Sequence, residues 1–367
     1  MKVFVTGTRG IPDIPGGVEK HCQELYPLIA DKGHQIILST RKSYVTYHQS
    51  SWKKVNLIHT YAPRRKSLEA IVHTFLSVIK ARLVNPDIVH IHAVGPGLMV
   101  PFARMLGLKV VVTNHGPDYD RQKWNGVAKI MLRLGECLGC YFANEVIIIS
   151  KVIADIVQRR CNRSTHLIYN GVALPEKSEK ADFLNKIGVA KQEYIIAVSR
   201  FVPEKGLDLL IQAYQSIDMG YKLVIAGDAD HETQYSRSIH ELAAKDSRII
   251  LTGYVGGEDL NQVYSHARLF VLPSFHEGLP IALLEAMSYG LSILVSDIPA
   301  NLEVGLDQDR YFTCGDVDDL QQKMKILVEK QLTEVEKQKI QRQIETDYNW
   351  NLIADQTIEV YKKVMAG

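Results

Sequence analysis

The feature that most constrains the fold of this chain is a regular alternation of short apolar runs with longer amphipathic stretches. The first half contains five near-continuous apolar runs: KVFVTG, QIILST, DIVHIHA, KVVVTNH and EVIIIS. Such runs are typical of strands buried on both faces. The segments between them, including 67–83 and 127–142, carry apolar residues at helical spacing. Strands and helices in alternation predict an α/β fold with a doubly wound parallel sheet.

The same alternation begins again in the second half of the chain. A turn-rich junction, HLIYNGV at 166–172, precedes YIIAVS, KLVIAG, RIILTG, LFVLPS and SILVSD, each followed by a helical pattern. A chain of 367 residues is also too long for one ordinary core. We therefore expect two Rossmann-like domains, at 1–170 and 171–346, with a final helical segment at 347–367. Ligands of open α/β sheets bind at the carboxyl ends of the strands, so the loops there are expected to carry the chemistry, in a cleft between the domains.

Composition and charge narrow the classes of function. No run of about eighteen uncharged apolar residues occurs, so a membrane-spanning helix is not expected. The N-terminus, MKVFVTG, lacks the pattern of a signal peptide, which favours a cytoplasmic protein. Residues 1–170 hold 23 Lys+Arg against 11 Asp+Glu, whereas the remainder holds 20 against 30. The basic half predicts an anionic partner such as a membrane surface. Nucleic acid is disfavoured because clustered aromatic residues and a recognised binding module are both missing.

The cysteine pattern does not predict a metal site. The five cysteines fit reduced thiols, and Cys137-Leu-Gly-Cys140 is a lone CxxC in a helical pattern. Zinc would need a second pair or histidines at ligand spacing, so we interpret these thiols as structural.

The loop after the first strand, TGTRGIPDIPGGVEKH, predicts an anion site. Its glycines allow close approach of a ligand to the backbone, and the helix that follows offers free N–H groups to an anion. Because the spacing is not GxGxxG, NAD binding is disfavoured. A second candidate from the first half is His115, which follows the strand VVVTN and is placed to hydrogen-bond a polar ligand.

Two loops of the second half carry charged candidates. SRFVPEKG places Arg200 and Lys205 around a turn that opens a helix, and such cations suit a diphosphate leaving group. SFHEGLPIALLEAMSYG places Glu277 on a loop and Glu285 on the helix behind it. The seven-residue separation of the two carboxylates suits two ends of one elongated ligand, for example the diol and the sugar of a nucleotide-sugar. Pro280 is expected near the first turn of this helix, and backbone N–H groups of Gly278 and Leu279 are expected at its N-terminus, beside the phosphates of the ligand.

Together these motifs resemble the retaining glycosyltransferases of family 4, which have the GT-B fold. The matching motifs occur in family order over nearly the whole chain: the Gly16-Gly17 loop, the HG after a strand, YNGV, SRFVPEKG, AGD, and the EX7E motif in its EGLP context. The EX7E motif is quite specific and the others moderately so. The stretch GTRGIPDIPGGVE further resembles bacterial members that build surface polysaccharides, such as capsule, O-antigen of lipopolysaccharide or exopolysaccharide.

The resemblance implies a role for each matching residue. Catalytic roles are implied for His115 and Glu277 at the donor sugar, and for Arg200 and Lys205 at the diphosphate. The implied donor-binding residues further include Gly16, Gly17, Tyr254, Val255, Gly278, Leu279, Pro280 and Glu285, with Glu285 at the ribose and Tyr254-Val255 near the base. The final helix would cross back onto the first domain.

The resemblance also implies a reaction that needs no cofactor and no metal. A sugar would pass, with retention, from a nucleoside-diphosphate donor, with UDP as the first candidate, to a hydroxyl of a glycan or lipid-linked acceptor. Asp228 and Asp230 form a DxD by sequence, but AGD is the ordinary strand end of the family, so we interpret them as structural.

The acceptor and the membrane are expected on the first domain. Arg121, Lys123 and Trp124 follow the HG loop and are candidates for the acceptor side. The basic run Arg64-Arg65-Lys66 precedes an amphipathic helix, which suits peripheral contact with the inner face of the cell membrane, although core packing explains the apolar stripe equally well.

Other functions stay open at this stage. A nucleotide-sugar epimerase on the same architecture would use the donor site without an acceptor, and a catalytically silent sugar-nucleotide sensor would keep the site without the reaction. The sequence does not specify the donor sugar, the acceptor or the oligomeric state.

Overall fold

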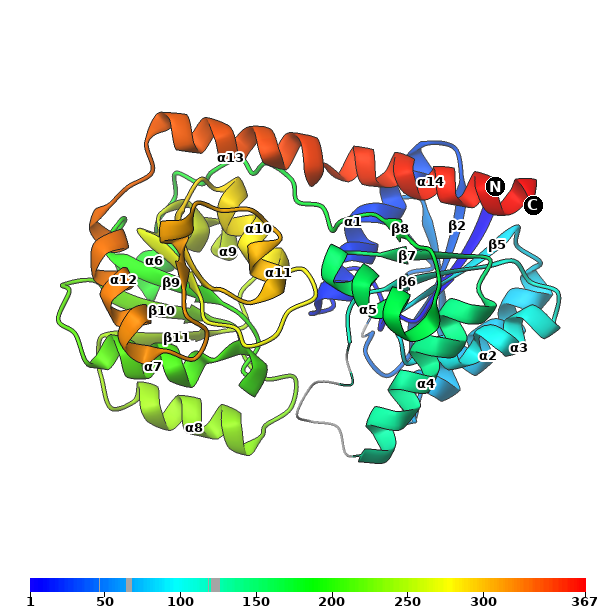
Figure 1. The fold of residues 1–367 in the computed structure, drawn as a ribbon, viewed down its shortest axis with the longest axis horizontal. Coiled ribbons are helices and arrows are strands. Elements are labelled where there is room, and N and C mark those ends of the chain that lie inside the picture. Colours follow the sequence, from blue (N-terminus) through cyan, green and yellow to red (C-terminus); the bar gives the residue numbers. More distant parts are fainter. Residues whose placement is uncertain (46, 64–67, 118, 120–125) are drawn as a thin grey trace. The chain divides into compact units, whose positions relative to one another are not determined.

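The computed structural model describes residues 1–45, 47–63, 68–117, 119 and 126–367 (Figure 1). The chain forms two compact units, of which unit 1 comprises residues 1–171 and 348–367 and unit 2 comprises residues 172–347. Six residues named above lie outside the described residues: Arg64, Arg65, Lys66, Arg121, Lys123 and Trp124.

Unit 1 is built on an eight-stranded sheet in the order β3-β4-β2-β1-β5-β6-β7-β8. Every pairing is parallel except β3 with β4. The strands are β1 (Lys2–Thr6), β2 (Gln35–Arg41), β3 (Ser51–Trp52), β4 (Val55–Thr60), β5 (Ile88–His92), β6 (Val110–Asn114), β7 (Glu145–Ile148) and β8 (His166–Leu167). Strands β1, β5 and β6 are almost wholly buried, which explains their continuous apolar runs.

Helices cover both faces of the unit 1 sheet, as the alternation predicted. They are α1 (Gly17–Asp31), α2 (Glu69–Val84), η1 (Pro96–Met99), α3 (Val100–Met105), α4 (Gly126–Phe142), α5 (Lys151–Cys161) and α14 (Trp350–Ala366). The core on one face joins side chains of β1 and β2 to α1 and α14, and α2, η1, α3 and α4 pack together elsewhere in the unit (Figure 1). The last helix of the chain is therefore part of the core of unit 1.

Unit 2 is built on a six-stranded, wholly parallel sheet in the order β11-β10-β9-β12-β13-β14. The strands are β9 (Tyr194–Val198), β10 (Lys222–Ala226), β11 (Ile249–Gly253), β12 (Leu269–Leu272), β13 (Ser292–Ser296) and β14 (Tyr311–Phe312). The helices are α6 (Asp182–Lys186), η3 (Pro203–Lys205), α7 (Leu207–Gln215), α8 (Gln234–Ala243), α9 (Gly257–Ser265), α10 (Ile281–Ser288), α11 (Pro299–Leu302), η4 (Gln308–Arg310), α12 (Val317–Glu329) and α13 (Glu334–Asp347). One core packs α7, α8 and α12 on this sheet, so each unit has the expected doubly wound architecture.

Each sheet has a topological switch point, the position from which the strand order along the chain runs outward in both directions. It lies between β1 and β5 in unit 1 and between β9 and β12 in unit 2. The backbones that leave these strands run very close together. A Cβ atom on Gly7 would lie 2.2 Å from the carbonyl oxygen of His92, and one on Gly206 would lie 2.3 Å from that of Pro273. Both glycines also have positive φ, so only glycine fits at these two crossings.

No helix among the described residues is both long enough and apolar enough to cross a membrane. The five cysteines are free thiols, in agreement with the reading of their pattern as reduced.

Candidate functional site

The switch point of unit 2 joins two of the predicted charged residues. Lys205, at the end of η3, donates a hydrogen bond from Nζ to Oε1 of Glu277, which lies on the loop between β12 and α10. The hydroxyl of Ser274 donates to the same oxygen over 2.7 Å. The side chains of Lys205 and Glu277 are only 18% and 9% exposed. A cation and a carboxylate are thus held together where two loops leave neighbouring strands, the usual ligand position of an open α/β sheet.

Arg200 follows β9 on the same loop as Lys205, but it has a different partner. Its Nη1 lies 3.0 Å from Oδ2 of Asp230, and both side chains are about one third exposed. An ion pair with this exposure contributes little stability, about 0–1 kcal/mol, so an anionic ligand can replace Asp230 at low cost. Arg200 and Lys205, the two residues predicted to bind a diphosphate, thus pair with different carboxylates in this structure.

Glu285 lies on α10 and accepts a hydrogen bond from a buried tyrosine. The hydroxyl of Tyr264 on α9 donates to Oε2 of Glu285 over 3.1 Å, and the ring of Tyr289 stacks on Tyr264 with the centroids 5.0 Å apart. Burial, and then the charge of Glu285, raises the pKa of Tyr264 well above its ordinary value, so this hydroxyl keeps its proton and remains a donor. This hydrogen bond holds the carboxylate of Glu285, whose side chain is partly buried.

The glycine-proline loop before α10 differs in detail from the prediction. The helix begins at Ile281, with Pro280 as the residue that precedes it. The N–H groups of Gly278 and Leu279 therefore belong to the loop and not to the first turn of the helix. Leu279 is buried, whereas Gly278 is partly exposed.

Tyr254 and Val255 lie away from the Lys205–Glu277 pair in the sheet order. They follow β11, which is the edge strand of unit 2 and is separated from β9 by β10. Tyr254 is 63% exposed. A base-binding role for these two residues would place the base over the edge of the sheet.

In unit 1 the Gly16-Gly17 loop is held by an ion pair at the start of α1. Gly16 precedes the helix, and Gly17 is its exposed first residue. Glu19 accepts hydrogen bonds from the backbone N–H of Arg9 at 2.9 Å and from its Nε at 3.2 Å. Burial alone would raise the pKa of Glu19, but the charge and hydrogen bonds of Arg9 hold it below its ordinary value. The carboxylate thus stays ionised and fixes the loop.

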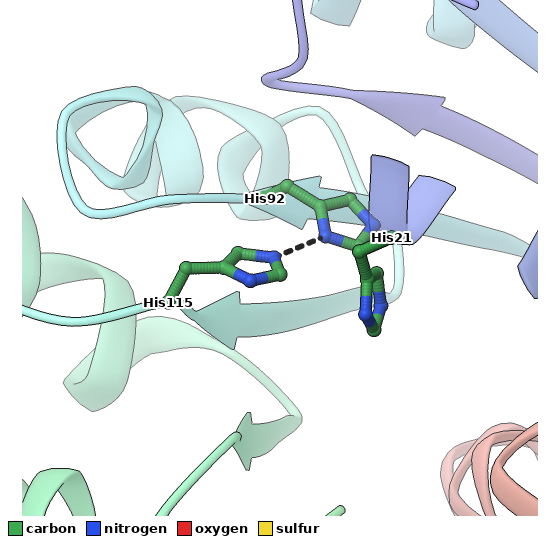
Figure 2. Close-up of side chains that lie close together, drawn as sticks. All are labelled: His21, His92 and His115. Carbon is green, nitrogen blue, oxygen red and sulfur yellow. Dashed lines mark hydrogen bonds between the residues drawn. The ribbon is translucent and has the colours of Figure 1, made fainter. Parts of the chain in front are cut away.

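His115 follows β6 and lies against two other histidines at the switch point of unit 1. Figure 2 shows His92, the last residue of β5, joined to His115 by a hydrogen bond, with His21 of α1 beside them. The bond joins His92 Nδ1 and His115 Nε2 over 2.9 Å. The ring of His21 lies 5.6 Å from that of His92 and 5.0 Å from that of His115, centroid to centroid.

Burial keeps all three rings neutral near pH 7. It lowers the pKa of His21 and of His115 to about 3, with a further contribution from neighbouring histidines, and it lowers the pKa of His92 well below its ordinary value. His21 and His92 are buried, and His115 is partly exposed. A neutral imidazole can donate one hydrogen bond and accept another, so His115 is suited to bind a polar ligand rather than to pair with an anion.

His21, His92 and Tyr264 were not predicted from the sequence. A signal for His92 was present, because a histidine stands at the end of the strand in both DIVHIHA and KVVVTNH. These two strands are parallel neighbours, so they end at the same edge of the sheet. His21 and Tyr264 lie on helices, where the surrounding sequence carried no comparable indication of a site.

Two family models match the chain, one over each half. Residues 15–175 match the model described as Glycosyltransferase Family 4, and residues 179–346 match the one described as Glycosyl transferases group 1. The chain is a glycosyltransferase with the GT-B fold.

Relatives and solved structures agree with this assignment. An uncharacterized glycosyltransferase of Methanocaldococcus jannaschii is 25% identical over all of this chain and 99% of its own. The O-antigen chain mannosyltransferase B of Escherichia coli is 34% identical over 37% of this chain and 36% of that protein. Sucrose-phosphate synthase of Thermosynechococcus elongatus superposes with a TM-score of 0.86 at 20% identity, over 100% of this chain and 99% of that one. Anabaena HepE, in complex with UDP and glucose, superposes with 0.78 at 17%, over 99% of each chain. The two structures confirm the expected fold.

Proposed function

We propose that this glycosyltransferase moves a sugar from a nucleoside-diphosphate donor to a hydroxyl of a glycan or lipid-linked acceptor, with retention at the anomeric carbon. The observation that carries the proposal is the pairing of Lys205 with Glu277 at the switch point of unit 2, with the carboxylate of Glu285 on the adjoining helix. A cation for the diphosphate and carboxylates for hydroxyl groups are the chemistry that a nucleotide-sugar requires.

In unit 2, Lys205 and Arg200 bind the diphosphate, and Arg200 exchanges Asp230 for a phosphate oxygen. Glu285 accepts hydrogen bonds from the ribose diol, with Tyr264 holding its other side. Glu277 contacts the donor sugar, and Gly278 and Leu279 offer backbone N–H groups to phosphate.

In unit 1, His115 contacts the donor sugar near the bond that breaks, and Gly17 provides a backbone N–H group to phosphate. The chain uses no metal in this proposal, because its own cations stabilise the departing diphosphate. Retention follows from a front-face reaction, in which the leaving phosphate helps to remove the proton of the acceptor hydroxyl. The protein then acts mainly by positioning both substrates and by stabilising charge.

UDP is the first candidate for the nucleotide of the donor. HepE, whose fold is shared, binds UDP and glucose, and this supports a UDP-sugar. The mannosyltransferase name of the O-antigen relative makes a mannosyl donor the second candidate. That relative also supports a role in bacterial surface polysaccharide synthesis, with a capsule, O-antigen or exopolysaccharide precursor as the acceptor.

We further propose peripheral contact with the inner face of the cell membrane through unit 1. Helix α4 exposes Val127, Ile130 and Leu134, which share one face at helical spacing, and the same turns of the helix carry Lys129 and Arg133. Exposed apolar side chains with neighbouring cations suit an anionic lipid surface.

A thermal-shift and calorimetric screen tests the donor site. The intact protein is titrated with UDP, GDP, dTDP, ADP and CMP, alone and as sugar conjugates. A selective shift with one nucleoside diphosphate supports the site and identifies its base, because a ligand that binds only the native state stabilises it. No shift with any of them would overturn the proposal. A change in the donor sugar without transfer to an acceptor would instead identify an epimerase.

A further inference from the structure

We propose that His21, His92 and His115 form a binding site for a zinc ion, and that zinc at this site inhibits sugar transfer. The ion is not a cofactor of the reaction in this proposal. It occupies the ring of His115, which the donor sugar needs. The inhibitory part rests on the proposed function, whereas zinc binding itself does not.

The positions of the ring nitrogens support the site. One nitrogen from each histidine lies within 4.8 Å of the other two. In a tetrahedral zinc site the Zn–N distances of 2.0–2.1 Å place the nitrogens about 3.4 Å apart. His92 and His115 already lie within this spacing, at 2.9 Å. Closing the remaining gap to His21 requires only small side-chain rotations, and three histidines leave a fourth position for water.

The partners on the far side of two rings orient them for a metal. His21 Nδ1–H donates to Oδ1 of Asn170 over 3.0 Å, which leaves the lone pair on Nε2. His92 Nε2 is hydrogen-bonded to the hydroxyl of Tyr26, so its Nδ1 faces His115. A hydrogen bond of this kind on the second nitrogen is the usual support of a metal-ligating histidine, because it fixes the tautomer and the ring orientation.

The hydrogen bond between His92 and His115 explains what zinc would change. His92 Nδ1 and His115 Nε2 now share one proton in a hydrogen bond. With zinc bound, both nitrogens present lone pairs to the ion, and the shared proton moves to the second nitrogen of the ring that carries it, either His115 Nδ1 or His92 Nε2. No net proton is released by this exchange. A ligand can displace the hydrogen bond to His92 but not the bond to zinc, so His115 no longer offers Nε2 to a ligand.

The three elements that carry these residues make the site rigid. His92 ends a wholly buried strand, His115 follows the neighbouring strand, and His21 lies in the second turn of α1. His115 is partly exposed, so an ion can reach the cluster from its side. Since no carboxylate or thiolate belongs to this cluster of three, the charge of zinc is not neutralised by its ligands. We therefore expect reversible binding from added zinc rather than a permanently loaded structural site.

Binding is tested on the intact, metal-depleted protein by titration with zinc chloride against a chromogenic chelator. Cobalt(II) chloride serves as a second probe, because its absorption reports tetrahedral nitrogen coordination. We expect one equivalent of zinc, and at least roughly tenfold weaker binding in both His21→Gln and the supporting variant Asn170→Ala. His73→Gln is the matched control, since His73 is a buried histidine of the same unit outside the cluster. It should bind zinc like the wild type.

Two results would overturn the site: wild-type protein that binds no zinc stoichiometrically, or His21→Gln that binds as tightly as wild type. If a variant fails to fold, the cobalt spectrum of the wild type still decides, because an octahedral spectrum would exclude the three-histidine site.

A second arm tests inhibition separately. Sugar transfer is measured with and without zinc, in wild type and in Asn170→Ala. Inhibition that weakens in step with zinc affinity supports the proposal. Zinc bound at the three histidines with undiminished transfer would overturn the inhibitory role. If nucleoside diphosphates fail to bind even without zinc, the result contradicts the proposed donor site and not the zinc site.

Discussion

At the scale of single residues, Glu285 provides a direct test of the donor site. Replacing it with Ala removes a carboxylate that we place on the ribose diol and leaves the hydroxyl of Tyr264 without this acceptor. A hydrogen bond to a charged group contributes about 1.5–3 kcal/mol, so the Kd for the nucleoside diphosphate should rise roughly 10- to 150-fold. Isothermal titration calorimetry measures it. Tyr264→Phe keeps the carboxylate and should have the smaller effect, and an unchanged Kd in Glu285→Ala would remove the ribose role.

Lys205 is expected to act mainly on turnover. Lys205→Met removes the cation that we place on the departing diphosphate, and by analogy with oxyanion donors this costs about 3 kcal/mol of transition-state stabilisation, or roughly 150-fold in kcat. Steady-state rates on the wild type, Lys205→Met and Lys205→Arg check this, with Lys205→Arg as the variant that keeps the charge. Because Lys205 is paired with Glu277, the double variant with Glu277→Gln separates loss of the diphosphate contact from the unpaired carboxylate. Wild-type kcat in Lys205→Met would exclude Lys205 from the diphosphate site.

The candidate residues were predictable because glycine, proline and charge mark the loops, but their pairings were not. Lys205 and Glu277 are distant in the sequence, and their ion pair depends on β9 and β12 being neighbours in the sheet. That strand order is a property of the tertiary fold. The same reason hid the contact of His21 with His115, because the helix that carries His21 and the loop that carries His115 are far apart in the sequence.

At the scale of elements, the apolar face of α4 is expected to bind anionic membranes. Ile130→Glu places a negative charge in the middle of this face, where Val127 and Leu134 are its exposed neighbours. Co-sedimentation with vesicles that contain an anionic lipid should then fall severalfold, because apolar burial is lost and the lipid charge repels the new carboxylate. Val335→Glu on α13 is the control, since Val335 is also exposed but lies in unit 2. Equal binding of both variants would remove α4 from the membrane contact.

The elements themselves were largely predictable, whereas their ends were less so. Buried parallel strands are continuous apolar runs, and β1, β5 and β6 lie where such runs occur. Helix α10 begins one residue after Pro280, so the loop N–H groups are not those of a helix terminus. The sequence could not assign this boundary, because proline fits both the first turn of a helix and the residue before it.

At the scale of the whole molecule, the last twenty residues should decide whether unit 1 folds. Although α14 is far from the N-terminus in sequence, six of its large side chains enter the core of unit 1: Trp350, Ile353, Ile358, Val360, Tyr361 and Val364. Each contributes about 1.5–3 kcal/mol by burial, and together they approach the 5–15 kcal/mol that separates a typical folded domain from its unfolded state. The ring of Trp350 also covers Gly171, where a Cβ atom would lie 2.5 Å from it.

A chain that ends at Asp347 should therefore keep unit 2 folded and lose unit 1. Differential scanning calorimetry is expected to show a transition of unit 2 close to its position in the full chain, and limited proteolysis should cut freely within 1–171. The point variant Trp350→Ala should destabilise unit 1 by about 3–5 kcal/mol without abolishing its folding. A truncated chain with a protease-resistant first unit would show that the burial of α14 is compensated elsewhere in that core, contrary to the packing argued above.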